Sequence, residues 1–237
     1  MESLKNWDNR TWLSSSEYIQ KFNRFLLNQK KLNKNSKILD IGCGRGKIIG
    51  DLYTNLNLRN KPIGIDIENH KDKNKNMIFK KTDAIPFLLK TKENYDLILI
   101  KQTIHLLKFS QIKKLINICK KRLNFNGKII ILSLDPNGNE LPTFSLMKKD
   151  LRKSLKRDKK IFNLINKIEK NVIKKKFNFK VKISKRKYLQ MIKNRFISTL
   201  LSFSKKQILD GIKEINLKYD EYLIFNDRLI CLSLNKS

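Results

Sequence analysis

The most informative segment of the chain is Lys37-Ile38-Leu39-Asp40-Ile41-Gly42-Cys43-Gly44-Arg45-Gly46-Lys47. Its apolar residues before the first glycine predict a short strand that is buried on both faces. The three glycines then allow a sharp turn and a close approach of the backbone to a ligand. Apolar residues recur at helical spacing after the turn, so a helix should begin here with its free N–H groups towards the ligand. The stretch predicts a site for a nucleotide-type cofactor.

The glycine spacing separates the classes of cofactor site. Dinucleotide sites read G-x-G-x-x-G, but Lys47 stands where the third glycine would be, and the actual pattern is D-x-G-x-G-x-G. A P-loop needs Ser or Thr after its lysine, and here Ile48 follows Lys47. The segment Ile38 to Gly46 instead resembles motif I of the class I S-adenosylmethionine-dependent methyltransferases.

Four later segments resemble further parts of that family, in the same order. Pro62 to Glu68 looks like a second buried strand, and its Asp66 would accept hydrogen bonds from both ribose hydroxyls. Thr82 to Phe87 resembles the adenine-binding segment, with Asp83 at the adenine amino group. Tyr95 to His105 looks like the fourth strand and the turn where cofactor and substrate meet, and Leu123 to Leu132 looks like the fifth strand.

The resemblance implies the cofactor S-adenosylmethionine and a set of residues that bind it. These are Asp40, Gly42, Cys43, Gly44, Gly46, Asp66, Ile67, Asp83, Ala84 and Lys101. Asp83 has a second interpretation as a helix cap. Asp40 either orients the glycine loop or lies at the sulfonium, and the sequence leaves both open. Cys43 is expected to pack as a small residue, because the local sequence offers no partner that would activate its thiol.

The fold expected is a Rossmann-like, doubly wound α/β domain with a mostly parallel sheet and an antiparallel last strand. We expect one domain over residues 1–237: an N-terminal cap segment at 1–36, a cofactor-binding core at 37–135, and a C-terminal half at 136–237 with a helical insertion at 185–220. Further elements predicted are a helix at 14–28, a basic helix from Leu151 to Val172, strands at 177–184 and 223–234, and a capping box at Ser204 and Gln207.

Composition bounds the class of protein. The three cysteines have unrelated spacings, which gives neither a disulfide framework nor a zinc pattern, and no other metal site is expected. No apolar run reaches the roughly 20 residues of a membrane span, so we expect a soluble, cytoplasmic protein with reduced thiols. The sequence leaves the oligomeric state open.

The formal net charge of +32 at pH 7 permits a nucleic-acid partner. However, lysine far outnumbers arginine, and asparagine and isoleucine are abundant as well. These three residue types share A- and T-rich codons, so a base bias in the genome raises them together. Phosphate recognition favours the arginine fork instead. We therefore interpret most of the charge as compositional background.

The function expected is methyl transfer to a small-molecule acceptor by direct in-line displacement. Trp7, Trp12 and Tyr18 are candidates for an aromatic wall, with packing of the first helix as the other interpretation. Arg195 is a candidate clamp for an anionic acceptor, or else a structural arginine. His105 is the candidate general base if the acceptor needs one, or else a histidine on a helix packed against the sheet. The alternatives are an RNA methyltransferase that uses the basic surface, and a non-catalytic protein that retained the fold.

Overall fold

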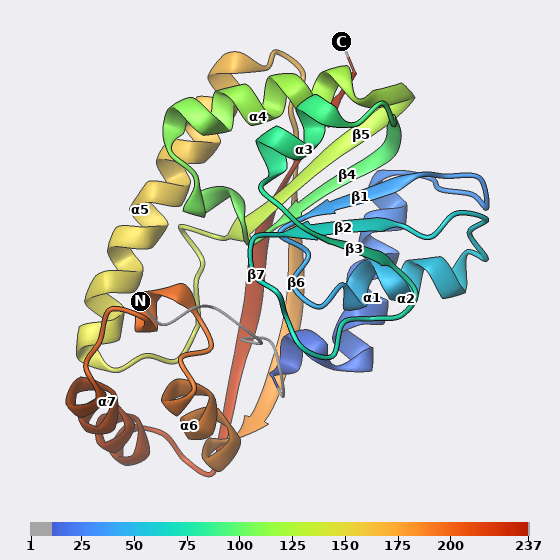
Figure 1. Ribbon diagram of the computed structural model, residues 1–237. Helices are drawn as coiled ribbons and strands as arrows, with labels where there is room; N and C mark the ends of the chain where they lie inside the picture. The colour runs from blue at the N-terminus through green and yellow to red at the C-terminus, as the bar shows by residue number, and fades with distance from the viewer. Residues whose placement is uncertain (1–10, 237) are drawn as a thin grey trace.

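The computed structural model describes residues 11–236, which form a seven-stranded sheet flanked by helices (Figure 1). The strands are β1 (Ile38–Ile41), β2 (Ile63–Asp66), β3 (Ile78–Lys81), β4 (Tyr95–Lys101), β5 (Leu123–Leu134), β6 (Ile173–Ser184) and β7 (Tyr222–Asn235). The helices are α1 (Ser16–Gln29), α2 (Lys47–Asn55), α3 (Ala84–Lys90), α4 (Phe109–Lys121), α5 (Ser145–Ile168), α6 (Lys185–Lys193) and α7 (Lys205–Lys218). Short 3-10 turns occur at Trp12–Ser14, Ile104–Leu106 and Ser198–Leu200.

The strand order is β3-β2-β1-β4-β5-β7-β6. The strands β1 to β5 pair in parallel, whereas β7 lies antiparallel to both β5 and β6. This confirms the doubly wound α/β fold with an antiparallel last strand. The order reverses at β1 and β4, and ligands of open α/β sheets bind beyond the carboxyl ends of the strands at such a reversal.

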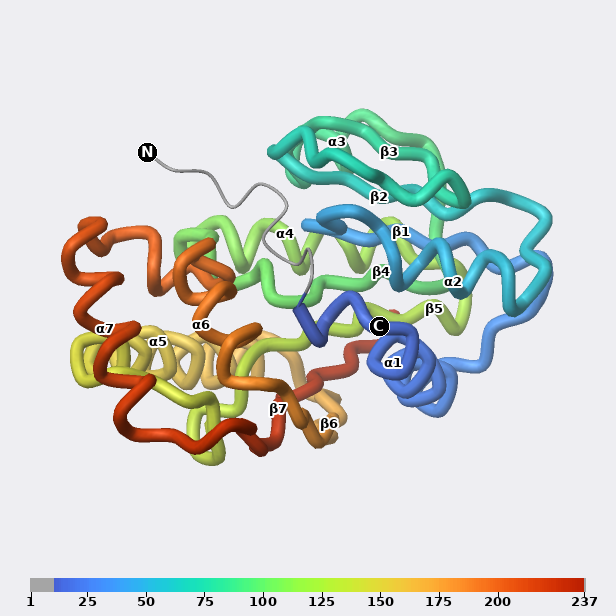
Figure 2. The backbone as a smooth tube through the Cα atoms, turned by 90° about the horizontal axis from the view of Figure 1, so that it is seen from below, coloured from blue at the N-terminus to red at the C-terminus, as the bar shows by residue number. Residues whose placement is uncertain are grey.

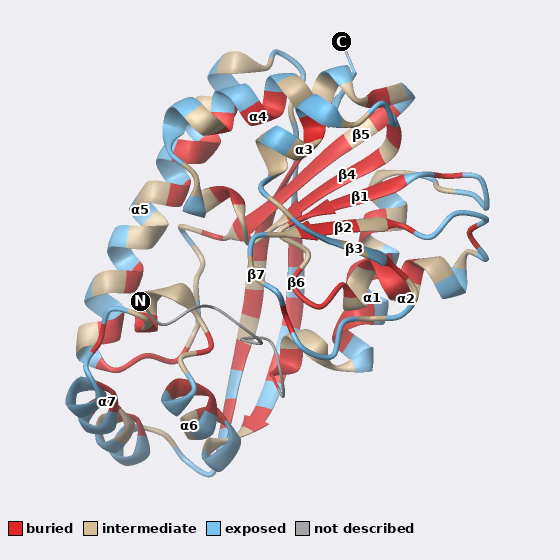
Figure 3. Ribbon diagram, viewed as in Figure 1, coloured by how far each residue is buried: buried red, intermediate tan, exposed pale blue. Residues whose placement is uncertain are grey.

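Each face of the sheet has its own core. Residues of α1, α2, α6, α7 and the start of α5 pack on one face, and residues of α3, α4 and the later part of α5 pack on the other. The central strands β1 and β4 are mostly buried and mostly apolar because both of their faces are covered, as the red in Figure 3 shows for their burial. Figures 1 and 2 place α6 and α7 beside α5, away from α2. The 185–220 insertion therefore adds helices beside α5, at the end of the sheet away from α2.

Several expected boundaries need adjustment. The basic helix ends at Ile168, and Val172 lies beyond it. The strand expected at 177–184 begins at Ile173, because the long β7 pairs with it along its whole length; Phe177 lies opposite Leu229. The capping box is confirmed, since Ser204 Oγ accepts from Gln207 N at 3.2 Å while the Gln207 side chain accepts from Ser204 N at 2.8 Å. Among residues 11–236, no helix is both long and apolar enough to cross a membrane.

Candidate active site

The glycine loop after β1 is fixed against the neighbouring strand. The N–H groups of Gly42 and Cys43 both donate to the carbonyl oxygen of Ile65, at 2.8 and 3.1 Å. Gly42, Gly44 and Gly46 all have positive φ, of 73°, 56° and 67°. A Cβ atom on Gly42 would lie 2.0 Å from Thr103 Oγ1, so only glycine fits there. The loop thus leads into α2 in one defined conformation.

Asp66 ends β2 beside this loop and remains an ionised acceptor. Its Oδ2 atom accepts from Gly44 N at 2.9 Å, and its Oδ1 atom accepts from Glu68 N at 3.0 Å. His70 Nε2 lies 3.5 Å from Oδ2. Burial alone would raise the pKa of Asp66, but the contacts with His70, Glu68 and Gly44 outweigh it and hold the pKa below its ordinary value. A carboxylate has about four acceptor positions, so capacity for ligand hydroxyls remains.

Asp83 has the cap role that the sequence left open. Its side chain accepts from Ile85 N at 2.9 Å and begins α3. The residue also lines the cavity described below, together with Ala84 and the largely exposed Ile67. The capping bond orients the carboxylate without covering it, and the role at adenine stays a prediction.

Asp40 lies in β1 just before the glycine loop, and Cys43 is part of the loop. Asp40 is buried, and this burial together with the charge of Asp66 raises its pKa to about 7, although Lys101 opposes the shift. Burial and the charges of Asp40 and Asp66 raise the pKa of the Cys43 thiol far above its ordinary value. Cys43 therefore packs as a small, unreactive residue, and its Sγ atom would lie 2.8 Å from a Cβ atom on Gly64.

Lys101 ends β4 with its ammonium group among aromatic rings and carboxylates. Its Nζ atom lies 5.3 Å from the ring centre of Tyr18 and 5.4 Å from that of Phe22. Its charge also lowers the pKa of Asp227, which burial raises. Asp227, on β7, accepts from Trp12 Nε1 at 3.0 Å. Lys101 is thus held between the glycine-loop strand and the last strand.

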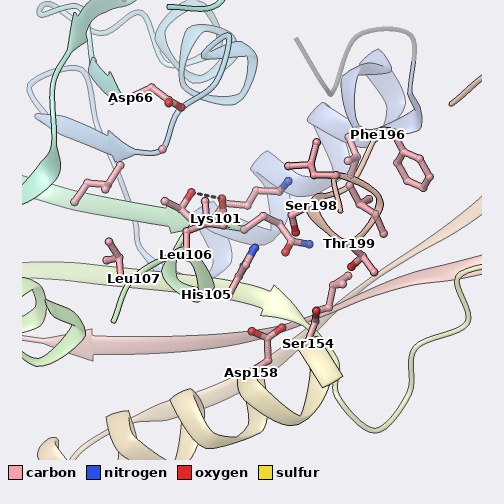
Figure 4. Close-up of a pocket in the computed structure, with 18 of the residues that line it drawn as sticks. Asp66, Lys101, His105, Leu106, Leu107, Ser154, Asp158, Phe196, Ser198 and Thr199 are labelled. Atoms are coloured by element: carbon pink, nitrogen blue, oxygen red, sulfur yellow. Dashed lines mark hydrogen bonds between the residues drawn. The ribbon is translucent and has the colours of Figure 1, made fainter. Parts of the chain in front are cut away.

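A single cavity of about 550 Å³ joins these elements. Its cofactor end is lined by Gly42, Asp66, Asp83 and their neighbours, and its other end by residues of β7, α5 and the segment 196–201. In Figure 4, Lys101 and His105 lie between Asp66 and Phe196. The sequence-predicted residues that line the cavity are Trp12, Gly42, Asp66, Ile67, Asp83, Ala84, Lys101 and His105.

Two expectations about the acceptor wall are corrected. Tyr18 is fully buried beneath Lys101 and does not line the cavity. Arg195 does not line it either, because its Nη1 atom donates to the carbonyl oxygens of Leu200 and Phe203, at 2.6 and 2.5 Å. It braces the turn that carries the wall segment 196–201. Trp7 lies outside the described residues.

His105 lies on the 3-10 turn after β4 and lines the middle of the cavity. Burial and the charge of Arg157 lower its pKa to about 4, so its imidazole is neutral at neutral pH. Its buried Nδ1 atom has no hydrogen-bond partner among residues 11–236. His105 is therefore better suited to accept a hydrogen bond from a ligand than to hold a proton.

Three buried ionisable residues that line the cavity were not predicted from the sequence: His70, Asp158 and Asp227. His70 lies four residues after Asp66 in a loop, and no sequence pattern there indicated a site. Asp158 and Asp227 did carry a signal, because each interrupts an apolar pattern. Asp158 occupies the buried stripe of α5 between Leu151 and Ile165, and Asp227 occupies the buried alternation of β7. A charge on a buried stripe marks either a paired structural group or a site.

A methyltransferase domain family matches residues 32–195, well over half of the chain. The chain belongs to this family. The match spans the glycine loop, Asp66, Asp83 and Lys101, and the open α/β sheet is the class I arrangement. The protein is therefore an S-adenosylmethionine-dependent methyltransferase, and S-adenosylmethionine is its cofactor.

Solved structures show the same fold for this methyltransferase at low sequence identity. A putative methyltransferase from an antibiotic biosynthesis pathway of Anabaena variabilis is 15% identical, with a TM-score of 0.60 over 91% of this chain and 97% of that chain. The plantazolicin methyltransferase BpumL, solved with S-adenosylhomocysteine, is 19% identical, with a TM-score of 0.52 over 97% and 88%. The precorrin 8w decarboxylase of Methanobacterium thermoautotrophicum is 12% identical, with a TM-score of 0.53 over 90% and 88%. No curated protein sequence matches the chain.

The residues present fit the cofactor. The ionised Asp66 would hold the ribose hydroxyls, and Asp83 with Ile67 and Ala84 would frame the adenine. An added Cβ on Gly44 would meet no atom of the described protein within 4 Å, so the backbone there faces open space. This is the approach that a ligand-binding glycine turn requires.

Proposed function

We propose that this methyltransferase transfers the methyl group to a small-molecule acceptor enclosed in the cavity. The observation that carries the proposal is the continuity of the cavity from Asp66 to the wall at 196–201. A volume of about 550 Å³ is in the range of small-molecule sites. The acceptor end is walled by Trp12, Phe196 and Leu141, which supports an enclosed ligand with apolar surface.

The placement of positive charge favours a small molecule over RNA. The lysines of α5 face outward and line a separate groove, with Lys148, Lys149, Arg152, Lys153 and Lys156. The acceptor end of the cavity instead contains Asp158 and Asp227. An RNA methyltransferase would need its phosphate-binding charge around the entrance through which the base reaches the cofactor.

The chain's own residues would act mainly by position. When bound, the cofactor supplies a methyl group on a positively charged sulfur, which is already a good leaving group. The wall at 196–201 and Trp12 would exclude water, and the neutral His105 would accept a hydrogen bond from the acceptor's nucleophilic group. His105 is a weak base because its pKa lies near 4, so an acceptor with a free lone pair suits this site best.

The test is transfer of a tritiated methyl group from S-adenosylmethionine to an extract of the producing cells. We expect label in the fraction of small metabolites, dependent on Asp66 and unaffected by Asp210→Asn. Asp210 is an exposed carboxylate on α7 and serves as the matched control. Label that precipitates with RNA and is released by ribonuclease would contradict the small-molecule acceptor.

A further inference from the structure

Asp158 lies at the acceptor end of the cavity, and one of its two carboxylate oxygens has no hydrogen-bond partner among the described residues. It projects from α5 and is only 4% exposed. Its Oδ2 atom accepts from Ser133 Oγ at 3.2 Å, while its Oδ1 atom has no hydrogen-bond partner among residues 11–236. Figure 4 shows Asp158 and Ser154 on the same side of α5, facing the cavity, and both residues line it.

The charge of Arg157 acts on Asp158, but Arg157 makes no hydrogen bond to this oxygen. Two of its N–H groups are directed to backbone carbonyls instead. Arg157 donates from Nε to the carbonyl of His105 at 3.1 Å and from Nη2 to the carbonyl of Leu107 at 2.6 Å. Its guanidinium also lies over the ring of Phe109, 5.1 Å from the centre. A buried oxygen without a donor is costly, and folding gains nothing from it. An asparagine or leucine at this position of the buried α5 stripe would give a more stable fold. The carboxylate therefore points to a role in binding a ligand.

The other ionisable groups near Asp158 indicate which charge a ligand should carry at this end of the cavity. Asp227 is held by Trp12 Nε1 and lies beside Lys101, so these two opposite charges offset each other. His105 is neutral and adds a buried ring nitrogen, Nδ1, that has no hydrogen-bond partner among the described residues. Asp158 is therefore the acidic group of the chamber that keeps an unpartnered oxygen among residues 11–236, although Arg157 offsets part of its charge. Hydroxyl and amide groups such as those of Ser154, Ser198 and Asn226 also line this chamber. The buried Oδ1 atom of Asp158 that lacks a donor favours a cationic ligand over an anionic one.

We propose that Asp158 anchors a cationic nitrogen of the methyl acceptor, such as an ammonium, amidinium or guanidinium group. This inference rests on the proposed function. The anchored nitrogen is not the methylated atom, because a protonated nitrogen has no lone pair to attack a methyl group. The acceptor thus has two parts: a cation at Asp158, and a nucleophile near His105 and Lys101, where β4 meets the cofactor end. The apolar wall of Trp12, Phe196 and Leu141 would contact the skeleton between them.

Three probes with a similar skeleton test the anchor: phenethylamine, phenethyl alcohol and phenylacetate. Each is titrated by ligand-observed NMR into the protein saturated with S-adenosylhomocysteine. We expect the amine to bind at least about tenfold more tightly than the alcohol, and the carboxylate to bind least. Asp158→Asn should remove this preference. Asp150→Asn, a more exposed acidic position on the same helix, should retain it.

Asp158→Ser is a second variant that removes the charge, and unchanged affinity for S-adenosylhomocysteine shows that either variant is folded. The anchor is overturned if the alcohol or the carboxylate binds as well as the amine, if both variants keep the preference, or if the amine fails to bind at about 10 mM. If the wild-type protein does not bind S-adenosylhomocysteine by calorimetry, the cofactor assignment fails instead. The two failures are therefore distinguishable.

Discussion

Replacing Asp66 by alanine should weaken cofactor binding and loosen the glycine loop together. The carboxylate accepts the N–H groups of Gly44 and Glu68 at 2.9 and 3.0 Å, and in our proposal it also accepts the ribose hydroxyls. Hydrogen bonds to a charged group contribute about 1.5–3 kcal/mol, so the dissociation constant for S-adenosylmethionine should rise by about 10- to 150-fold. The two freed N–H groups should lower the free energy of unfolding by about 1–3 kcal/mol.

Calorimetry on the wild type, Asp66→Ala, Asp66→Asn and Asp210→Asn measures the first effect, and urea unfolding measures the second. Asp66→Asn keeps the shape of the side chain and should fall between the other variants. Because the pKa of Asp66 is held low, its contribution to stability is present above about pH 4 and is lost as the pH falls through the folded pKa. Unchanged cofactor affinity in a folded Asp66→Ala protein would refute the reasoning.

Four further predictions follow from other contacts. Burial raises the pKa of Asp158 from 3.8 to about 6, so the ionised carboxylate destabilises the fold above pH 6. In thermal unfolding, Asp158→Asn should be more stable than the wild type by about 1–3 kcal/mol near pH 8. Below about pH 4 the two proteins should have almost the same stability. Trp12→Phe keeps a ring but removes the donor to Asp227, and should cost about 1–3 kcal/mol in urea unfolding; no loss would mean that water replaces the donor. Arg195→Lys removes the guanidinium that holds two carbonyls, so hydrogen exchange should quicken across residues 196–203 while cofactor affinity stays constant; unchanged exchange would exclude the brace. Binding to total RNA should be weak and not saturable at physiological salt, whereas a tight complex with a steep salt dependence would favour the RNA alternative.

The places of the glycine loop, Asp66 and Asp83 in the fold could be predicted from the sequence because they depend on local structure. A strand, a glycine turn and a helix fix the loop within one short segment. Asp66 is the last residue of β2, and Asp83 lies just beyond the end of β3. Parallel strands bring these carboxyl ends to one edge of the sheet whatever the tertiary detail. The same reasoning found the capping box at Ser204, since that motif is also local.

The acceptor half could not be predicted in the same way, because it depends on packing between distant segments. Arg195 has the charge to bind an anion, but the turn after it folds back towards its side chain. The guanidinium then donates hydrogen bonds to the carbonyl oxygens of Leu200 and Phe203. Tyr18 has the ring for a cavity wall, but the length of β6 and β7 buries it against Phe177 and Phe179. Asp158 and Asp227 meet at one cavity only once α5 lies along the sheet.

A crystal structure with S-adenosylhomocysteine would show where the cofactor lies in the cavity. We expect density for the ribose at Asp66, for the adenine beside Asp83 and Ile67, and for the sulfur near Lys101, with the chamber towards Asp158 and Phe196 left open for the acceptor. Density at another site, or a homocysteine moiety that fills the chamber towards Asp158, would contradict the claim that one cavity brings the cofactor and a small acceptor together.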